Sequence, residues 1–291
     1  MLRELKTFVT VARHGSFAAA GQVIGLTPSA ISAQIRNLEQ ELGMRLFDRT
    51  GRTALLNMNG KKALALAEEM LATFSRMAEV GDGATIRGEL KVGAIATVQT
   101  GILPGALVSL QRQAPDLKIH LVPGMSLTLL NQVDSGEIDL ALLVKPPFSL
   151  QKDLHSEDLA QEEFVLITPH RITSDDPAEI LSDHPFIRYD RASFAGRLVA
   201  RFLQQQGIDP DQILELDEIE AIVRMVEGGL GVSIVPLAGL WITTADRVRV
   251  LRLGRLAFHR TLQAVVRYSQ RTVPAVELFL GCVREAVTQS R

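Results

Sequence analysis

The chain contains a single cysteine, Cys282, among its 291 residues. One thiol excludes an intrachain disulfide, and a redox-sensing role would need a second thiol to resolve the oxidised sulfur. Because Cys282 lies in the apolar run VELFLGCV, we expect it to be a buried packing residue.

Motifs that carry catalytic or metal chemistry are also missing. No two of the six histidines are three or four residues apart, the spacing that places two ligands on one helix face. No G-x-S-x-G, phosphate-binding G-x-x-x-x-G-K or H-E-x-x-H pattern occurs. The GGLG cluster at residues 228–231 follows a predicted helix, so it indicates a helix end and not a nucleotide site. We therefore predict no catalytic residue, no metal and no cofactor, in a protein that is not an enzyme.

Long apolar runs are absent as well. The longest, such as IDLALLV, are far too short to span a bilayer. The N-terminal stretch MLRELKTFVTVARHG lacks the long apolar core and small-residue cleavage site of a signal peptide. We expect a cytoplasmic protein that makes no membrane contact.

Net charge is only −2, but it is unevenly distributed. Residues 1–60 hold seven Lys and Arg against four Asp and Glu, whereas the remaining residues hold 24 against 29. The basic end is therefore the candidate for contact with a polyanion, although its excess of positive charge is modest.

Residues 16–56 predict two short helices, a tight turn and a small wing. Ser16 can cap a helix that ends at Gly25, and Thr27 with Pro28 can begin the next helix. Two helices joined by a three-residue turn are typical of a helix-turn-helix. Four apolar residues are expected on the buried arc of the second helix: Ile31, Ile35, Leu38 and Leu42.

The opposite face of that helix is small, hydroxylic and basic, which suits either a DNA major groove or an ordinary solvated surface. The following turn, DRTGR at residues 48–52, carries arginines that can reach phosphates or the minor groove. Arg49 can equally form a salt bridge at the base of the wing, so Arg52 is the better candidate. The predicted DNA-contacting residues are Thr27, Ser29, Ser32, Arg36, Arg49 and Arg52.

The segments FVTVARHGSFAAAG (8–21) and SAQIRNLEQELGMRLFDR (32–49) resemble the DNA-binding domain of the LysR-type transcriptional regulators. The resemblance covers about residues 1–60 without a gap. Pro28, Ser29 and Ala33 depart from the side chains that the family often has there, so base readout is expected to differ. Further landmarks of the family occur downstream: ILP (102–104), AP (114–115), GEIDLA (136–141) and VEGGLGVSIVP (226–236).

Residues 58–80 form one long helical pattern, which Asn57 can cap. Its apolar stripe follows a four-three spacing through Ala63, Ala67, Met70, Phe74 and Met77. This stripe packs either on its own domain or, as the resemblance implies, against an antiparallel linker helix of a second copy. A dimer would present two DNA-binding heads to two half-sites. The glycine-rich segment 81–85 predicts a hinge.

Beyond the hinge, predicted strands and helices alternate, and the first round, through residues 138–144, indicates a parallel sheet with right-handed crossovers. A second round of strands and helices begins at residue 163. Strands are expected at residues 89–95, 117–123, 138–144, 164–168, 186–189, 232–236, 249–253 and 262–268. Helices are expected at residues 101–114, 127–135, 195–206, 220–228 and 274–286. Two such lobes resemble a type 2 periplasmic-binding-protein fold, in which the chain crosses between lobes near residues 160–163 and Ser269.

A cleft between such lobes lies at the carboxyl ends of strands. The turns there carry hydroxyl, amide and apolar side chains, and an anion or carboxylate is one ligand that they can hold. Thr97 and Ser193 can instead be plain helix caps, and Met125 and Phe194 ordinary core. The candidate effector contacts are Thr97, Gln99, Thr100, Met125, Ser126, Ser193 and Phe194.

These features predict an N-terminal all-α winged helix-turn-helix (1–58), a linker helix and hinge (59–86), and an α/β two-lobed, periplasmic-binding-protein-like effector domain (87–291). Lobe I is expected at 87–161 and 269–291, and lobe II at 162–268. The expected function is a sequence-specific transcriptional regulator controlled by a small-molecule effector. The alternative is a small-molecule-binding protein or α/β enzyme with a helical oligomerisation arm. The resemblance implies double-stranded operator DNA, the effector, further copies in a homodimer or homotetramer, and RNA polymerase as partners.

Overall fold

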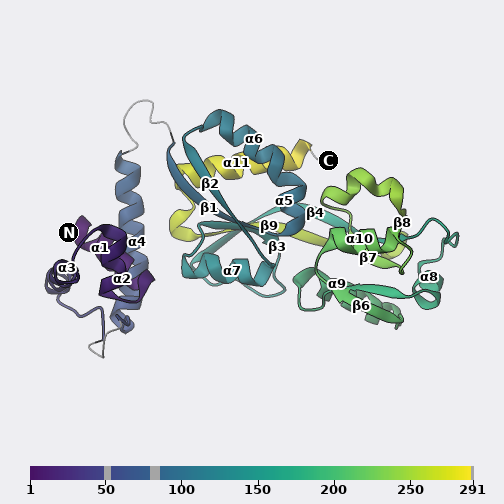
Figure 1. The fold of residues 1–291 in the computed structure, drawn as a ribbon, viewed down its shortest axis with the longest axis horizontal. Coiled ribbons are helices and arrows are strands. Elements are labelled where there is room, and N and C mark those ends of the chain that lie inside the picture. Colours follow the sequence, from purple (N-terminus) through teal and green to yellow (C-terminus); the bar gives the residue numbers. More distant parts are fainter. Residues whose placement is uncertain (49–53, 79–85, 290–291) are drawn as a thin grey trace. The chain divides into compact units, whose positions relative to one another are not determined.

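The computed structural model describes residues 1–48, 54–78 and 86–289 (Figure 1). The chain forms two compact units, Met1–Ala84 and Thr85–Arg291, each with its own hydrophobic core. None of the helices in the described residues combines the length and apolar character that crossing a membrane requires.

The described residues of the first unit form four helices and the base of a wing. The helices are α1 (Leu2–His14), α2 (Phe17–Ile24), α3 (Pro28–Leu42) and α4 (Met58–Ala78). The order and the bounds of α2 and α3 confirm the predicted helix-turn-helix.

Local capping defines the helix ends in this unit. Oγ of Ser16 accepts a hydrogen bond from the third residue of α2 at 3.1 Å, and Gly25 ends the helix in the left-handed conformation. Oγ1 of Thr27 and Oδ1 of Asn57 cap α3 and α4 in the same way, at 3.3 and 2.8 Å. Gly21 permits the tight turn, because a Cβ there would lie 2.5 Å from the carbonyl oxygen of Leu26.

The buried arc of α3 is shorter than the sequence predicted. Ile31, Ile35 and Leu38 are buried, but Leu42 is 44% exposed. Leu42 is the last residue of the helix, and the chain leaves the core at Gly43 with a left-handed turn. Its side chain instead lines an apolar groove that also includes residues of α4.

The base of the wing lies directly after α3. Phe47 and Leu56 form an antiparallel bridge, and the N–H of Asp48 donates to the carbonyl of Leu55 at 2.8 Å. The carboxylate of Glu39 accepts the N–H of Leu46 at 2.8 Å, which fixes the path from α3 into the wing. Residues 49–53 lie outside the described residues.

The apolar stripe of α4 divides into two parts. Ala63 and Ala67 are buried in the core of the first unit. Met70 and Phe74 of the stripe are exposed, as is Leu66, which the prediction did not include. The side chain of Met77 and the predicted hinge at residues 81–85 lie outside the described residues.

In the second unit, three parallel strands begin the sheet in the order β2-β1-β3. They are β1 (Gly88–Ala94), β2 (Leu117–Pro123) and β3 (Leu140–Val144). The connecting helices are α5 (Ala96–Thr100), α6 (Ile102–Gln113) and α7 (Ser126–Ser135). The closing helix α11 (Pro274–Gln289) returns to pack on α6, and α7 lies on the other face of the sheet (Figure 1). Cys282 of α11 is buried, as predicted.

Two long antiparallel strands, β4 (Leu154–Thr168) and β9 (His259–Arg267), connect the lobes. Strand β9 already pairs with β3 from Leu262 to Val266. The second crossing therefore lies within β9 and not near Ser269, where the sequence prediction placed it. A continuous strand has no turn residues at the crossing, so the pattern contains no signal for its position.

The second lobe is built on the later half of β4, which pairs with β7 (Ser233–Pro236) and β8 (Arg249–Arg252). A parallel pair, β5 (Phe186–Tyr189) and β6 (Gln212–Leu216), joins β7 through a bridge between Phe186 and Val232. The remaining helices are α8 (Pro177–Asp183), α9 (Phe194–Gln206), α10 (Ile219–Glu227) and the 3-10 segments η1 (Leu240–Arg247), η2 (Gly254–Leu256) and η3 (Tyr268–Gln270). Strand β6 and helix α8 were not predicted from the sequence.

Candidate functional site

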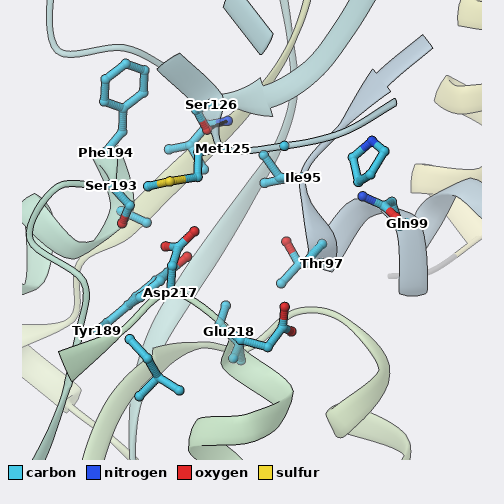
Figure 2. Close-up of a pocket in the computed structure, with 17 residues that line it drawn as sticks. Ile95, Thr97, Gln99, Met125, Ser126, Tyr189, Ser193, Phe194, Asp217 and Glu218 are labelled. Carbon is cyan, nitrogen blue, oxygen red and sulfur yellow. Dashed lines mark hydrogen bonds between the residues drawn. The ribbon is translucent and has the colours of Figure 1, made fainter. Parts of the chain in front are cut away.

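A cavity of about 420 Å³ lies between the two lobes of the second unit (Figure 2). It is formed at the carboxyl ends of β1, β2 and β3 from one lobe and of β5 and β6 from the other, which is where α/β sheets bind ligands. The lining residues are Ile95, Ala96, Thr97, Gln99, Pro123, Gly124, Met125, Ser126, Val144, Tyr189, Ser193, Phe194, Ala195, Leu216, Asp217, Glu218 and Ile219.

The structure brings six of the seven predicted effector contacts to this cavity, namely Thr97, Gln99, Met125, Ser126, Ser193 and Phe194. Thr100 is the exception. Its Oγ1 accepts the N–H of Leu240 at 3.2 Å, and it lines a second cavity of about 470 Å³. Thr100 is the last residue of α5 and lies against Gly239, away from the first cavity.

Several of the polar lining groups also have structural partners. Oγ of Ser193 caps α9 by accepting the N–H of Gly196 at 3.0 Å, so the capping alternative is confirmed for this residue. Oγ of Ser126 accepts the N–H of Val144 at 3.2 Å. The side-chain amide of Gln99 donates to the carbonyl oxygen of Ala94, in the first lobe, at 2.7 Å. These bonds fix the side chains in place at the cavity wall.

A buried arginine that the sequence did not identify lies behind this wall. Nε of Arg260 donates to Glu162 at 2.6 Å, and its Nη2 donates to Oγ1 of Thr97 at 2.7 Å. Its Nη1 is 3.5 Å from the phenol oxygen of Tyr189. Arg260 therefore links Thr97 of the first lobe to Tyr189 of the second. No motif indicated this, because Glu162 and Arg260 are 98 positions apart in the chain.

The acidic residue Asp217, which follows β6, is a second group that the sequence did not identify. Its Oδ1 is buried and has no hydrogen-bond partner among the described residues. Burial raises the pKa of Asp217 to about 6, and the carboxylates of Asp190 and Glu218 also raise it, whereas Ser193 and Arg260 lower it. Because β6 was not predicted, no pattern in the sequence placed Asp217 at a strand end.

The apolar part of the lining comes from both lobes. Met125 precedes α7, and Phe194 begins α9 (Figure 2). The ring of Phe148, in the segment after β3, packs edge-to-face on Phe194 at 5.8 Å between centroids. Burial raises the pKa of Tyr189 to about 12, so its phenol remains a neutral hydrogen-bonding group at the cavity wall. The cavity thus combines an apolar body with a few fixed polar groups, as small-molecule sites do.

In the first unit, the predicted DNA-binding face is exposed at the N-terminal half of α3. The hydroxyls of Thr27 and Ser29 lie 3.0 Å apart, and Ser32 is half-buried. Arg36 is exposed and forms no ion pair with any described residue. Arg49 and Arg52 lie outside the described residues. The described part of the predicted interface therefore presents hydroxyl groups and one unpaired guanidinium.

Neither unit contains, among the residues that the structure describes, a group of three His, Cys, Asp or Glu side chains placed to hold a metal ion.

Family models match both units. The model described as the bacterial regulatory helix-turn-helix protein, lysR family, matches residues 2–61, and the LysR substrate binding domain matches residues 83–288. The chain belongs to the LysR family of transcriptional regulators. The helix-turn-helix of the first unit and the two-lobed α/β domain of the second are therefore the DNA-binding and effector-binding domains of a LysR-type regulator.

Individual LysR relatives match along almost the whole chain. The chain is 29% identical to the uncharacterised HTH-type transcriptional regulator YfeR of Shigella flexneri, over 98% of this chain and 93% of that protein. Among solved structures, a full-length OxyR variant from Pseudomonas aeruginosa is similar with a TM-score of 0.71 at 23% identity, covering 98% and 94% of the two chains. Full-length LysG from Corynebacterium glutamicum with bound effector Arg has a TM-score of 0.70 at 15% identity, covering 99% and 98%.

Proposed function

We propose that this LysR-type regulator contacts operator DNA through α3 and the wing, and that a small molecule in the interlobe cavity controls it. The observation that carries the proposal is the cavity, in which polar side chains from both lobes face one space. A ligand that contacts both lobes stabilises the arrangement in which both contacts form. Binding therefore changes the population of lobe arrangements, which is the free-energy coupling that allosteric control requires.

The exposed stripe on α4 supports assembly from several copies. Leu66, Met70 and Phe74 are exposed, and Leu66 and Met70 line an apolar groove of about 340 Å³ with Leu42. Exposed apolar patches of this kind mark protein interfaces. We infer that the linker helix of a second copy covers the stripe in a homodimer or in a homotetramer built from dimers, which would present two α3 helices to two half-sites.

The remaining partners follow from the family. YfeR is named as a transcriptional regulator, and we infer that this chain is likewise not an enzyme. A protein that controls transcription works where the DNA is, so we infer a cytoplasmic location and contact with RNA polymerase at the promoter. The effector bound in LysG supports a ligand-holding role for this fold.

Arg36→Ala tests the DNA-binding face. Loss of this exposed guanidinium should weaken operator binding by about tenfold. It should also reduce the slope of log affinity against log salt concentration by about the value of one phosphate contact. Fluorescence anisotropy over a salt series, on a DNA fragment selected by the wild-type protein, measures both quantities. Arg201→Ala, which removes the same charge from an exposed position of α9, should change neither. Equal affinity and slope for Arg36→Ala and wild type would remove Arg36 from the interface.

Thr97→Val tests the cavity. We expect the effector response to be lost while DNA binding is retained, because Thr97 lines the cavity and also accepts a hydrogen bond from Arg260. The measurement is the change in operator affinity caused by a compound that a thermal-shift screen identifies as a ligand. Thr97→Ser keeps the hydroxyl and should keep the response. A full response in Thr97→Val would show that the effector binds elsewhere.

A further inference from the structure

The ionisable side chains that line the interlobe cavity are acidic or neutral. Among the described lining residues they are Asp217, Glu218 and the phenol of Tyr189, and no lysine, arginine or histidine is present. An anionic effector would bring its charge into about 420 Å³ beside carboxylates, with no cation in the lining to pair with it. The charge of the lining therefore favours a ligand of the opposite sign.

The carboxylate of Asp217 is placed to receive such a ligand. Figure 2 shows it directed into the space between Met125 and Thr97. Its Oδ1 is buried and unpaired among the described residues; the hydroxyl of Ser193 is close enough to lower the pKa of Asp217, but it donates to the carbonyl of Asp190 at 2.8 Å. A buried acceptor without a donor is costly, and an N–H group of a ligand would satisfy it.

Arg260 does not supply the missing cation. It lies outside the lining, its side chain is fully buried, and its Nε is paired with Glu162 at 2.6 Å. An arginine carries donors only, so the oxygen of Thr97 accepts the bond from Arg260 and the Thr97 proton remains available to a ligand. The cavity thus offers a carboxylate acceptor on one side and a hydroxyl donor on the other.

We propose that the effector is a small organic amine, bound with its protonated nitrogen against Asp217 and its apolar body against Met125 and Phe194. This assignment rests on the proposed function, because it names the ligand class of the same cavity. A hydrogen-bond acceptor on the amine, such as the carboxylate of an amino acid, would face the hydroxyl of Thr97. Amino acids and amino alcohols belong to this class, and carboxylates without an amine do not.

The test compares molecules that share one body and differ in charge. L-Phenylalanine carries both an ammonium and a carboxylate group, 2-phenylethylamine the ammonium only, and 3-phenylpropionate the carboxylate only. Leucine, 3-methylbutylamine and 4-methylpentanoate repeat the comparison with an aliphatic body. In isothermal titration of the full-length protein at pH 7.5, we expect amine-bearing members of at least one series to bind and the carboxylate-only members not to bind.

Variants then assign the binding to the carboxylate. Asp217→Asn should weaken binding of the amines at least about tenfold, because it removes the charge that pairs with the ammonium. Asp211→Asn, which neutralises an exposed carboxylate in the same lobe, should leave the affinity unchanged. The proposal is overturned if no amine binds, if the carboxylate-only compounds bind as tightly as the amines, or if Asp217→Asn binds amines like wild type.

An operator-binding assay with the same compounds separates this proposal from the proposed function. If the carboxylate-only compounds change the affinity for DNA and the amines do not, effector control stands and the amine assignment is wrong. If the amines bind through Asp217 but leave DNA binding unchanged, the amine assignment stands and effector control from this cavity is wrong.

Discussion

Replacing Arg260 with leucine should lower the free energy of unfolding of the effector-binding domain by about 3–5 kcal/mol, because removing one partner of a buried ion pair leaves the other charge unpaired. Arg260 is fully buried and its partner Glu162 is 11% exposed. Without the guanidinium, the Glu162 carboxylate is left uncompensated and Thr97 loses its donor. Urea unfolding of the full-length protein, monitored by the transition of this domain, measures the loss.

A double variant separates the ion pair from simple packing. In Arg260→Leu with Glu162→Leu both charges are gone, so we expect most of the lost stability to return. Arg260→Lys keeps the positive charge but lacks the planar guanidinium that donates to both Glu162 and Thr97. Its free energy of unfolding should therefore lie between those of wild type and Arg260→Leu. An Arg260→Leu protein as stable as wild type would show that the pair contributes nothing to joining the lobes.

Asp217→Asn should stabilise the protein without ligand at pH 7.5 while it abolishes the response to the effector. The pKa of Asp217 is raised from 3.8 to about 6 in the folded state, so the folded protein binds this proton more readily than the unfolded chain. The stability that this proton contributes is complete below about pH 4 and is lost as the pH rises through about 6. A pKa shift of about two units corresponds to about 3 kcal/mol in the free energy of unfolding. Because Asp217 is partly exposed to solvent, we expect a smaller difference of about 1–2 kcal/mol.

The pH dependence provides the check. The difference in melting temperature between Asp217→Asn and wild type should be near zero at pH 4, grow towards pH 6 and remain constant to pH 8. Asp211→Asn should show no such profile, because that carboxylate is exposed. A constant difference across the pH range, or a destabilised Asp217→Asn, would contradict the burial of this charge. A variant that is more stable but no longer responds to the effector is expected when the replaced residue serves the binding site at a cost to stability.

The helices of the DNA-binding domain and their ends could be predicted from sequence because their signals are local. The caps Ser16, Thr27 and Asn57 each bond a backbone N–H three residues further along the chain. Glycines mark the helix ends, and the apolar periodicity indicates the buried faces. Leu42 was the exception, since periodicity continues to the end of a helix whether or not the core does.

In the effector-binding domain, the alternation of strands and helices predicted the fold, and turns after strands predicted most of the cavity. The groups that give the cavity its charge were missed. Glu162 and Arg260 meet only because β4 and β9 pair, and Asp217 reaches the cavity only because β6 pairs with β5. Such contacts depend on topology and leave no periodic trace in the sequence.

The pairing of β4 with β9 limits the motions that we expect between the lobes. The connection between them is a hydrogen-bonded two-stranded ribbon that runs from the Leu154–Arg267 pair to the Glu163–His259 pair, and its register shifts between Asp158 and Ala160. A paired ribbon resists being pulled apart or sheared but yields to twisting, most easily where a bulge interrupts the ladder. We therefore expect the connection to resist separation of the lobes and to twist most easily near Asp158 and Ala160, so that an effector contacting both lobes would act by changing this twist.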